Sequence, residues 1–532
     1  MRHITAIAVT VAAVLTGTSL AGAPPASASL TETVVVTATG LLSPLAAVLE
    51  VGGTLLTQYN IIDGVEASIP AVLEPVLAAL PGITVSPDLS ITIGSTAVST
   101  EPHTPTDAFL TQTGATQLAA QGDTGQGVTV AVLDTGIDKL PDFSGRLIGG
   151  VDLSGGGNPF HDAYGHGTFV AGLIAGDGAS SGGEYAGEAP GANLVSIKVA
   201  GANGITSLAT VISGLQWAIA NQRKYKIEVL NISLGVQPTG STVLDPLDQA
   251  VEAAWNAGIA VVVSAGNAGP FNGTILSPGD DPLVITVGAL DDMASLSISG
   301  DEMTNFSSVG PTSPDGWVKP DLVTSGRSIV SLAAPGSTVD QGFPSARIGT
   351  GNFVGSGTSF SAAITSGAAA LVLADHPGLT PDQVKARLLG TASAGPVSNP
   401  FVDGHGALDA YAAATAHAMN FSQSVAGLSA TGGGSTVPLA PTSAVDTWNT
   451  SLWTGLHWKR LPPDGWLWDG ILWAGDEWNA WAGRAWNAWA WSGAAWNGAA
   501  WAGRAWNDVA WAGSSWAGSA WDSDAWDSSA WG

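Results

Sequence analysis

An aspartate, a histidine and a serine, which could together form an activated nucleophile, occur in three separate sequence motifs. Asp134 ends an apolar run in Asp-Thr-Gly, His166 stands in Gly-His-Gly-Thr, and Ser359 stands in Gly-Thr-Ser. A serine hydroxyl is a weak nucleophile and needs a neighbouring base. Imidazole suits that role because its pKa lies near neutrality, and a carboxylate can hold the imidazole in the productive tautomer. The set predicts a catalytic triad in which Ser359 attacks a carbonyl carbon.

An asparagine follows another apolar run and could complete this chemistry. Asn267 comes directly after residues 261–266, which are apolar and small. A side-chain amide at the end of a buried strand can donate a hydrogen bond to the oxyanion that forms during acyl transfer. Losing one such donor typically costs about 2.7–4 kcal/mol of transition-state stabilisation. We therefore predict that Asn267 contributes to an oxyanion hole.

The segments between these residues alternate apolar runs with helical patterns. The apolar runs cover 127–133, 192–199, 227–232, 259–263 and 283–287, and the helical patterns cover 168–175, 207–220 and 245–257. Apolar strands that alternate with helices indicate an α/β fold, with a mostly parallel sheet covered by helices on both faces. Such sheets carry their chemistry at the carboxyl ends of the strands, which is where Asp134 and Asn267 fall.

Taken together, these segments resemble the subtilisin-like family of serine peptidases. The resemblance rests on residues 132–137, 165–168, 265–267 and 357–359, in that order, and extends over about residues 120–418. It implies a subtilisin-like fold and an endopeptidase that hydrolyses protein or peptide substrates through an acyl-enzyme.

The resemblance also implies a substrate groove. It implies that Ser233, Leu234 and Gly235 pair with the substrate backbone, and that Ser264, Ala265 and Gly266 form one wall of the pocket. Residues 199–204 are implied along the other side of the substrate, and Leu276 near the pocket floor. The chain departs from the family at Ala363 and Ile364, where the family usually has Pro and His. This change affects the local backbone and removes no reacting group.

The first residues predict export. A basic residue near the start, an apolar stretch and the small-residue sequence ending at Ala28 are typical of a signal peptide, which would occupy residues 1–28. An uncleaved membrane anchor is the alternative. We therefore expect a secreted, extracellular protein, with association with the cell surface left open.

Residues 29–100 alternate strand and helix patterns, with a helix expected over 41–59, and predict a small α+β unit. The unit resembles the family's inhibitory propeptide. That resemblance implies a segment that assists folding and occupies the groove until the protease removes it autocatalytically, with a cut between about residues 99 and 108. An independent N-terminal domain is the alternative.

Composition excludes several classes of partner and site. The chain has 532 residues, a formal net charge of -27 and no cysteine. An acidic surface repels nucleic acid, so we expect no nucleic-acid partner. Without cysteine there is no disulfide, thiol nucleophile or Cys-ligated zinc. Structural calcium would suit an exported acidic protein, but no EF-hand-like spacing occurs, and we assign no metal ligand.

The C-terminal region has a different composition. After the peptidase domain, placed at 101–420, residues 421–447 are rich in Ser, Thr, Gly and Pro and predict a flexible linker. In the tail at 448–532, a Trp recurs every five residues from Trp481 to Trp531. This repeat could bind cell wall or polysaccharide, pack on itself, or be a removable or disordered tail. A surface-attachment or binding protein with a protease-like scaffold is the competing hypothesis for the whole chain.

Overall fold

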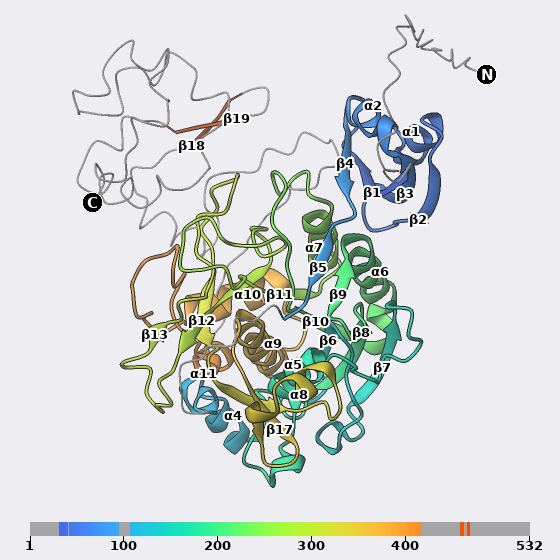
Figure 1. Cartoon of the computed structure of the whole chain (residues 1–532). Helices are drawn as coiled ribbons and strands as arrows, with labels where there is room; N and C mark the ends of the chain where they lie inside the picture. Colours follow the sequence, from blue (N-terminus) through green and yellow to red (C-terminus); the bar gives the residue numbers. More distant parts are fainter. Residues whose placement is uncertain (1–30, 41, 95–106, 417–457, 462–464, 469–532) are drawn as a thin grey trace, which may run out of the picture.

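The computed structural model describes residues 31–40, 42–94, 107–416, 458–461 and 465–468 (Figure 1). The predicted signal peptide and linker, and most of the predicted Trp-rich tail, lie outside these residues. Within the tail, strand β18 (Trp458–Leu461) pairs antiparallel with β19 (Gly465–Trp468).

The N-terminal unit is a small α+β layer pair. Its antiparallel sheet has the strand order β2-β3-β1-β4, formed by Thr54–Gln58, Gly64–Pro70, Thr31–Ala38 and Ile83–Pro87. Helices α1 (Pro44–Glu50) and α2 (Glu74–Ala78) pack against this sheet. The single helix expected over 41–59 is wrong. Helix α1 ends at Glu50 because Gly52 has a φ of 74°, a left-handed conformation that turns the chain back into β2.

The central sheet has eight strands and confirms the predicted α/β class. Along its main path the strand order is β13-β12-β11-β10-β6-β8-β7, and β14 pairs with β12. The strands are β6 (Thr129–Asp134), β7 (Leu147–Asp152), β8 (Asn193–Lys198), β10 (Ile227–Ile232), β11 (Ala260–Ser264), β12 (Ile285–Asp291), β13 (Glu302–Met303) and β14 (Leu322–Ser325). All neighbours are parallel except β12 and β13.

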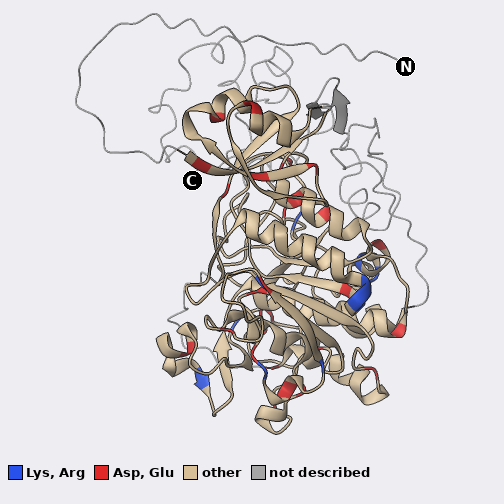
Figure 2. Cartoon of the chain, turned by 90° about the vertical axis from the view of Figure 1, so that its right-hand side faces the viewer, with Lys and Arg blue, Asp and Glu red and all other residues tan. Residues whose placement is uncertain are grey.

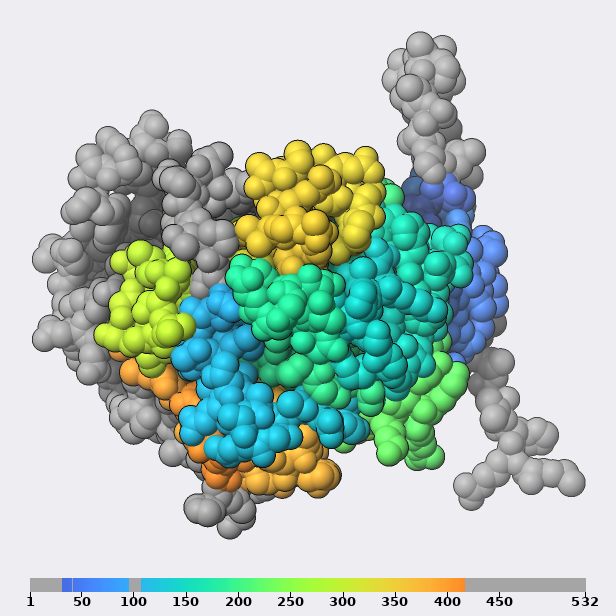
Figure 3. Space-filling model, turned by 90° about the horizontal axis from the view of Figure 1, so that it is seen from below, coloured from blue at the N-terminus to red at the C-terminus, as the bar shows by residue number. Residues whose placement is uncertain are grey.

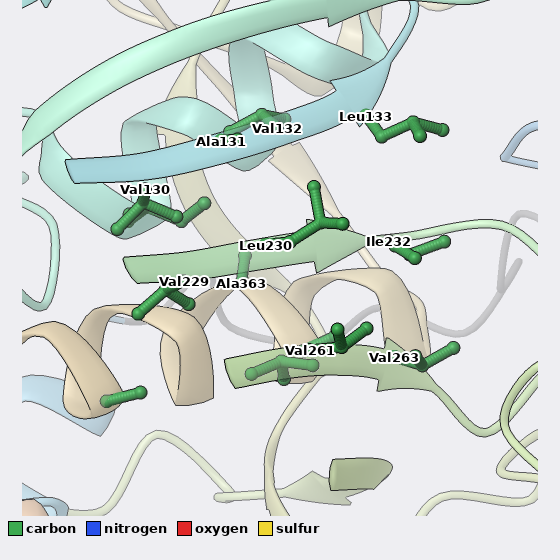
Figure 4. Packing of buried hydrophobic residues seen from close by; sticks show 14 of the residues in the cluster. Val130, Ala131, Val132, Leu133, Val229, Leu230, Ile232, Val261, Val263 and Ala363 are labelled. Atoms are coloured by element: carbon green, nitrogen blue, oxygen red, sulfur yellow. The ribbon is translucent and has the colours of Figure 1, made fainter. Parts of the chain in front are cut away.

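Helices cover both faces of this sheet. Helices α5 (His166–Ala175) and α9 (Thr358–Asp375) contact each other and one face, whereas α6 (Leu208–Tyr225) and α7 (Pro246–Asn256) pack together on the other face. Figure 4 shows Ala363 of α9 against β10. Helix α9 has the length and apolarity of a membrane span, but 89% of it is buried inside the fold. We therefore describe it as a core helix.

Smaller elements complete the described part of the chain. They are β5 (Ser90–Thr92), β9 (Ile205–Ser207), β15 (Ile329–Leu332), β16 (Arg347–Ile348), β17 (Asn352–Gly355), α3 (Phe109–Gln112), α4 (Ala115–Gln121), α8 (Thr338–Gly342), α10 (Pro381–Gly390), α11 (Ala410–Thr415), and the 3-10 turns η1 (Ala71–Leu73), η2 (Pro141–Phe143), η3 (Ala179–Ser181) and η4 (Pro344–Ala346). Helix α4 lies beside α11, in light blue and orange in Figure 3. Early and late segments of residues 107–416 therefore pack together.

Acidic residues outnumber basic residues, yet Lys319 and Lys385 lie buried in the core. Acidic residues are spread over the N-terminal unit and the central domain, and basic residues are few (Figure 2). Two lysines are nevertheless buried beside β12. Lys385 Nζ donates to the main-chain carbonyls of residues 282–284 at 2.9, 3.2 and 2.9 Å and lies 3.1 Å from an Asp321 carboxylate oxygen. Lys319 Nζ lies 2.7 Å from the other oxygen of Asp321, and burial lowers the pKa of Lys319 to about 8.

Candidate active site

Asp134 and His166 form a buried pair at the carboxyl end of β6. Asp134 is the last residue of β6 and His166 is the first residue of α5. His166 Nδ1 lies 2.8 and 2.9 Å from the two carboxylate oxygens of Asp134. Burial disfavours the imidazolium, but the Asp134 charge and hydrogen bond outweigh that effect, so the pKa of His166 is raised. The pair can therefore stabilise a proton on the imidazole.

A second carboxylate holds the turn on which His166 stands. Asp162 accepts hydrogen bonds from Gly165 N at 2.7 Å and Thr168 N at 2.8 Å, at the start of α5. It also accepts from the Thr135 hydroxyl at 2.8 Å. Burial raises the pKa of Asp162, although these three bonds oppose the rise. Asp162 is thus a local hydrogen-bonding residue that fixes the strand end and the helix start together.

Ser359 lies in the first turn of α9, close to the histidine. The rings of His166 and Phe360, the residue after Ser359, have centroids 5.8 Å apart. The Ser359 hydroxyl donates to the main-chain carbonyl of Ser233 at 3.2 Å. His166 Nε2 is buried and has no hydrogen-bond partner among the described residues. The Ser359 hydroxyl is therefore bonded to Ser233 and not to His166 Nε2 in this structure.

Asn267 is oriented by the residue that precedes Ser359. Asn267 Oδ1 accepts from the Thr358 amide and from the Thr358 hydroxyl, both at 2.9 Å. The same hydroxyl accepts from Gly266 N at 3.2 Å. Because the amide oxygen is occupied, Asn267 Nδ2 is left as the donor. Sequence reasoning did not single out Thr358, whose only signal was its place directly before Ser359.

Two of the predicted pocket residues, Gly235 and Gly266, lie against Leu276. A Cβ atom at Gly235 or at Gly266 would lie 2.8 Å from the Leu276 side chain. Ser233 Oγ donates to the main-chain carbonyl of Ser359 at 3.1 Å, which ties the end of β10 to the first turn of α9. Ser264 is the last residue of β11. Among the described residues, no group of three or more acidic or histidine side chains could hold a metal ion.

The tail of the N-terminal unit lies beside this site. Strand β5 pairs antiparallel with β9, and Ile91 stands opposite Thr206. The pairing continues with a 2.8 Å hydrogen bond from Ile93 N to Gly204 O. Ile91 and Ile93 are buried. Within the described residues, β9 rather than residues 233–235 forms the ladder with this segment.

The same unit is attached to the start of α6. Asp88 Oδ1 accepts from Ala209 N at 2.8 Å, in the first turn of that helix. The Leu208 amide donates to the carbonyl of Leu89 at 3.0 Å. The Tyr59 hydroxyl donates to the Ala209 carbonyl at 3.2 Å. A carboxylate at a helix N-terminus is favoured by the unpaired amides and the helix dipole.

Comparison with known proteins gives matches over the region that carries this geometry. The model of the subtilase family matches residues 125–417. Serine protease AprX of Bacillus subtilis (strain 168) is 44% identical over 292 residues, which cover 54% of this chain and 66% of that protein. Subtilisin NAT of Bacillus subtilis subsp. natto is 36% identical over 309 residues, covering 57% of this chain and 70% of that protein. Subtilisin of Bacillus pumilus is 35% identical over 309 residues, which are 97% of its length. These matches support a serine endopeptidase.

Proposed function

This chain belongs to the subtilase family, and we propose that it is a secreted serine endopeptidase with Asp134, His166 and Ser359 as its catalytic triad. The observation that carries the proposal is the buried His166–Asp134 pair, with Nδ1 bonded to the carboxylate at 2.8 Å and Nε2 without a described partner. A histidine held in this way is oriented to accept a proton at Nε2.

The reaction follows from these groups. The Ser359 hydroxyl turns from the Ser233 carbonyl, gives its proton to His166 Nε2 and attacks the carbonyl carbon of the scissile peptide bond. His166 then donates the proton to the leaving amine. In the second half of the reaction, His166 takes a proton from the water that attacks the acyl-enzyme and returns it to Ser359. Asp134 keeps the imidazole in the required tautomer and stabilises its charged form.

Asn267 and the Ser359 amide stabilise the oxyanion in this proposal. Two hydrogen bonds from Thr358 fix the Asn267 amide, so Nδ2 can donate without a further rearrangement. A donor held in advance at the developing charge is worth more than a mobile one because the site does not reorganise during the reaction.

The N-terminal unit keeps the precursor inactive. Its segment at β5 is added as a strand to β9, as a peptide substrate would be, and brings Gly94 next to His166. We therefore assign protein or peptide segments as substrates, and the unit at 29–100 as the chain's own inhibitor, removed by Ser359.

Expression of the wild type and Ser359→Ala in a bacterial host that exports proteins tests this function. Intact mass and N-terminal sequencing should show that the wild type loses its N-terminal unit whereas the variant keeps it. Loss of only the residues before about position 29 in both proteins would contradict self-processing. Asn267→Ala should cleave peptide substrates about 10²–10³-fold more slowly than wild type.

The Trp-rich tail is assigned a separate role in contact with cell wall or polysaccharide. The support is the recurrence of Trp every five residues, since indole faces stack on apolar faces of sugars. The Ser359→Ala protein should then sediment with purified cell wall, and a chain ending at residue 420 should not.

A further inference from the structure

Gly94 is the point at which the N-terminal unit reaches the catalytic histidine. The ladder between β5 and β9 ends with the hydrogen bond from Ile93 N to Gly204 O. Gly94 follows with a φ of 65°, a left-handed conformation suited to glycine. A Cβ atom at Gly94 would lie 3.0 Å from His166 Cδ2, the ring carbon bonded to Nε2. The segment therefore leaves the paired strand beside the atom that must move the proton.

One leucine side chain lies against both segments that the resemblance implies for the substrate pocket. Two glycines, Gly235 and Gly266, come from the two segments predicted to line it, and both face the Leu276 side chain. The Leu276 Cδ1 atom would lie 3.3 and 3.1 Å from a Cβ at these glycines. Leu276 therefore crowds the side-chain position beside both glycines, which favours a small substrate side chain there.

We propose that the enzyme cleaves after a small residue, and that the first bond it cuts is its own Gly94–Ser95 bond. This proposal rests on the proposed function, because it names the substrate of the same triad. Ile93 directly follows β5, is fully buried and donates its amide to Gly204 O, so the pairing extends one residue beyond the strand and Gly94 is the first residue after it. The cut lies earlier than the 99–108 interval expected from the sequence.

The step is an ordinary acyl transfer. Ser359 Oγ bonds to the carbonyl carbon of Gly94 while the bond from that carbon to Ser95 N breaks, and His166 passes the serine proton to Ser95 N. Water then attacks the acyl-enzyme, which releases Gly94 as a carboxylate and restores Ser359. No oxidant, reductant or further co-reactant is required.

The first test is the position of the cut in the full chain. Early samples of the wild type should contain a fragment ending at Gly94 and a chain beginning at Ser95, measured by intact mass and N-terminal sequencing. A cut elsewhere, with Ser359→Ala uncut, would overturn the assigned bond but leave the proposed function standing. No cut in either protein would count against the proposed function itself.

A matched pair of glycine variants separates the effect at the site from backbone strain. Gly94→Val should slow the cut at this bond by at least about tenfold, because its side chain would meet the ring of His166. Gly52→Val is the control: Gly52 has a φ of 74°, and a Cβ there has no neighbour within 4 Å. Equal rates in the two variants would contradict the placement of Gly94.

The second test uses peptides and does not depend on folding of the precursor. Synthetic peptides with the sequence of residues 88–101, and Gly, Ala, Leu or Phe at position 94, are given to the mature enzyme. The Gly and Ala peptides should be cleaved at least about tenfold faster than the Phe peptide. Leu276→Ala should raise the Phe-to-Gly ratio at least about tenfold, and Phe271→Ala, which changes a side chain that is 72% exposed, should leave the ratio as it was. Equal cleavage of Phe and Gly by the parent enzyme, or an unchanged ratio in Leu276→Ala, overturns the proposal.

Discussion

We expect Glu188→Gln to remove a loss of folding stability that the peptidase domain undergoes as pH rises. Glu188 is 1% exposed and lies between α5 and β8, against Gly367 of α9. One of its oxygens accepts from the Thr113 hydroxyl at 3.1 Å, and the other has no hydrogen-bond partner among the described residues. Burial raises the pKa of Glu188 to about 8, with the Thr113 bond opposing the rise. The carboxyl group is therefore protonated in the fold at neutral pH.

The size of the effect follows from proton linkage. The pKa of Glu188 rises from an ordinary 4.5 in the unfolded chain to about 8 in the fold. At pH values between 4.5 and about 8, the folded state therefore binds more protons than the unfolded state. The contribution of Glu188 to the free energy of unfolding is full below the unfolded pKa and is lost as pH rises through about 8. Each tenfold difference in proton affinity is worth about 1.4 kcal/mol, which gives an upper bound of about 5 kcal/mol.

The assay is thermal unfolding at a fixed scan rate, in a Ser359→Ala background that cannot digest itself. Between about pH 5 and about pH 9 the parent should lose up to about 10 °C more in melting temperature than Glu188→Gln, at about 2 °C per kcal/mol. Glutamine itself costs about 1–3 kcal/mol at every pH if its amide is left unpaired. The exposed Glu184→Gln in the same segment is the control. If Glu188→Gln shows the same pH slope as the parent, the buried carboxyl does not govern it and the reasoning fails.

Three further substitutions should change activity, inhibition and folding stability, respectively. Asp134→Asn should lower kcat/KM by about 10⁴-fold, measured on a chromogenic peptide, because the imidazole loses its required tautomer. Asp88→Ala removes the carboxylate bonded to Ala209 N and should weaken inhibition of the mature enzyme by the added N-terminal unit about fivefold, in line with a helix cap worth about 1 kcal/mol. Lys385→Met should cost about 3–5 kcal/mol of folding stability, seen as a lower melting temperature, because it leaves Asp321 and three buried carbonyls with fewer partners.

Much of the proposed catalytic arrangement could be predicted because each residue stands at the end of a regular element. Asp134 closes an apolar strand, and His166 and Ser359 start helices, so local patterns placed all three near one edge of the sheet. Their distances could not be predicted, since these depend on how α5 and α9 pack on each other. The same holds for Thr358, whose bonds to Asn267 join segments that lie 91 residues apart.

The N-terminal unit shows where pattern reasoning fails. Strand β2 (Thr54–Gln58) was included in a helix because its apolar residues fit a helical spacing as well as an alternating one. The true end of α1 depends on a single left-handed glycine, Gly52. The pairing of β5 with β9 was also missed: both strands have three residues, too few for a periodic signal, and they are far apart in sequence. Only the folded chain brings them together.

The buried ammonium of Lys385 has a consequence for how this protein can be inactivated. Three carbonyls and a carboxylate converge on it at 2.9–3.2 Å, an oxygen-rich shell of the kind that hard cations favour. Here the positive charge is covalently tethered to α10. It is present as soon as the chain is synthesised, does not depend on the ion content of the medium, and cannot be extracted by a chelator. At this position the protein supplies the positive charge itself, from a lysine side chain of α10.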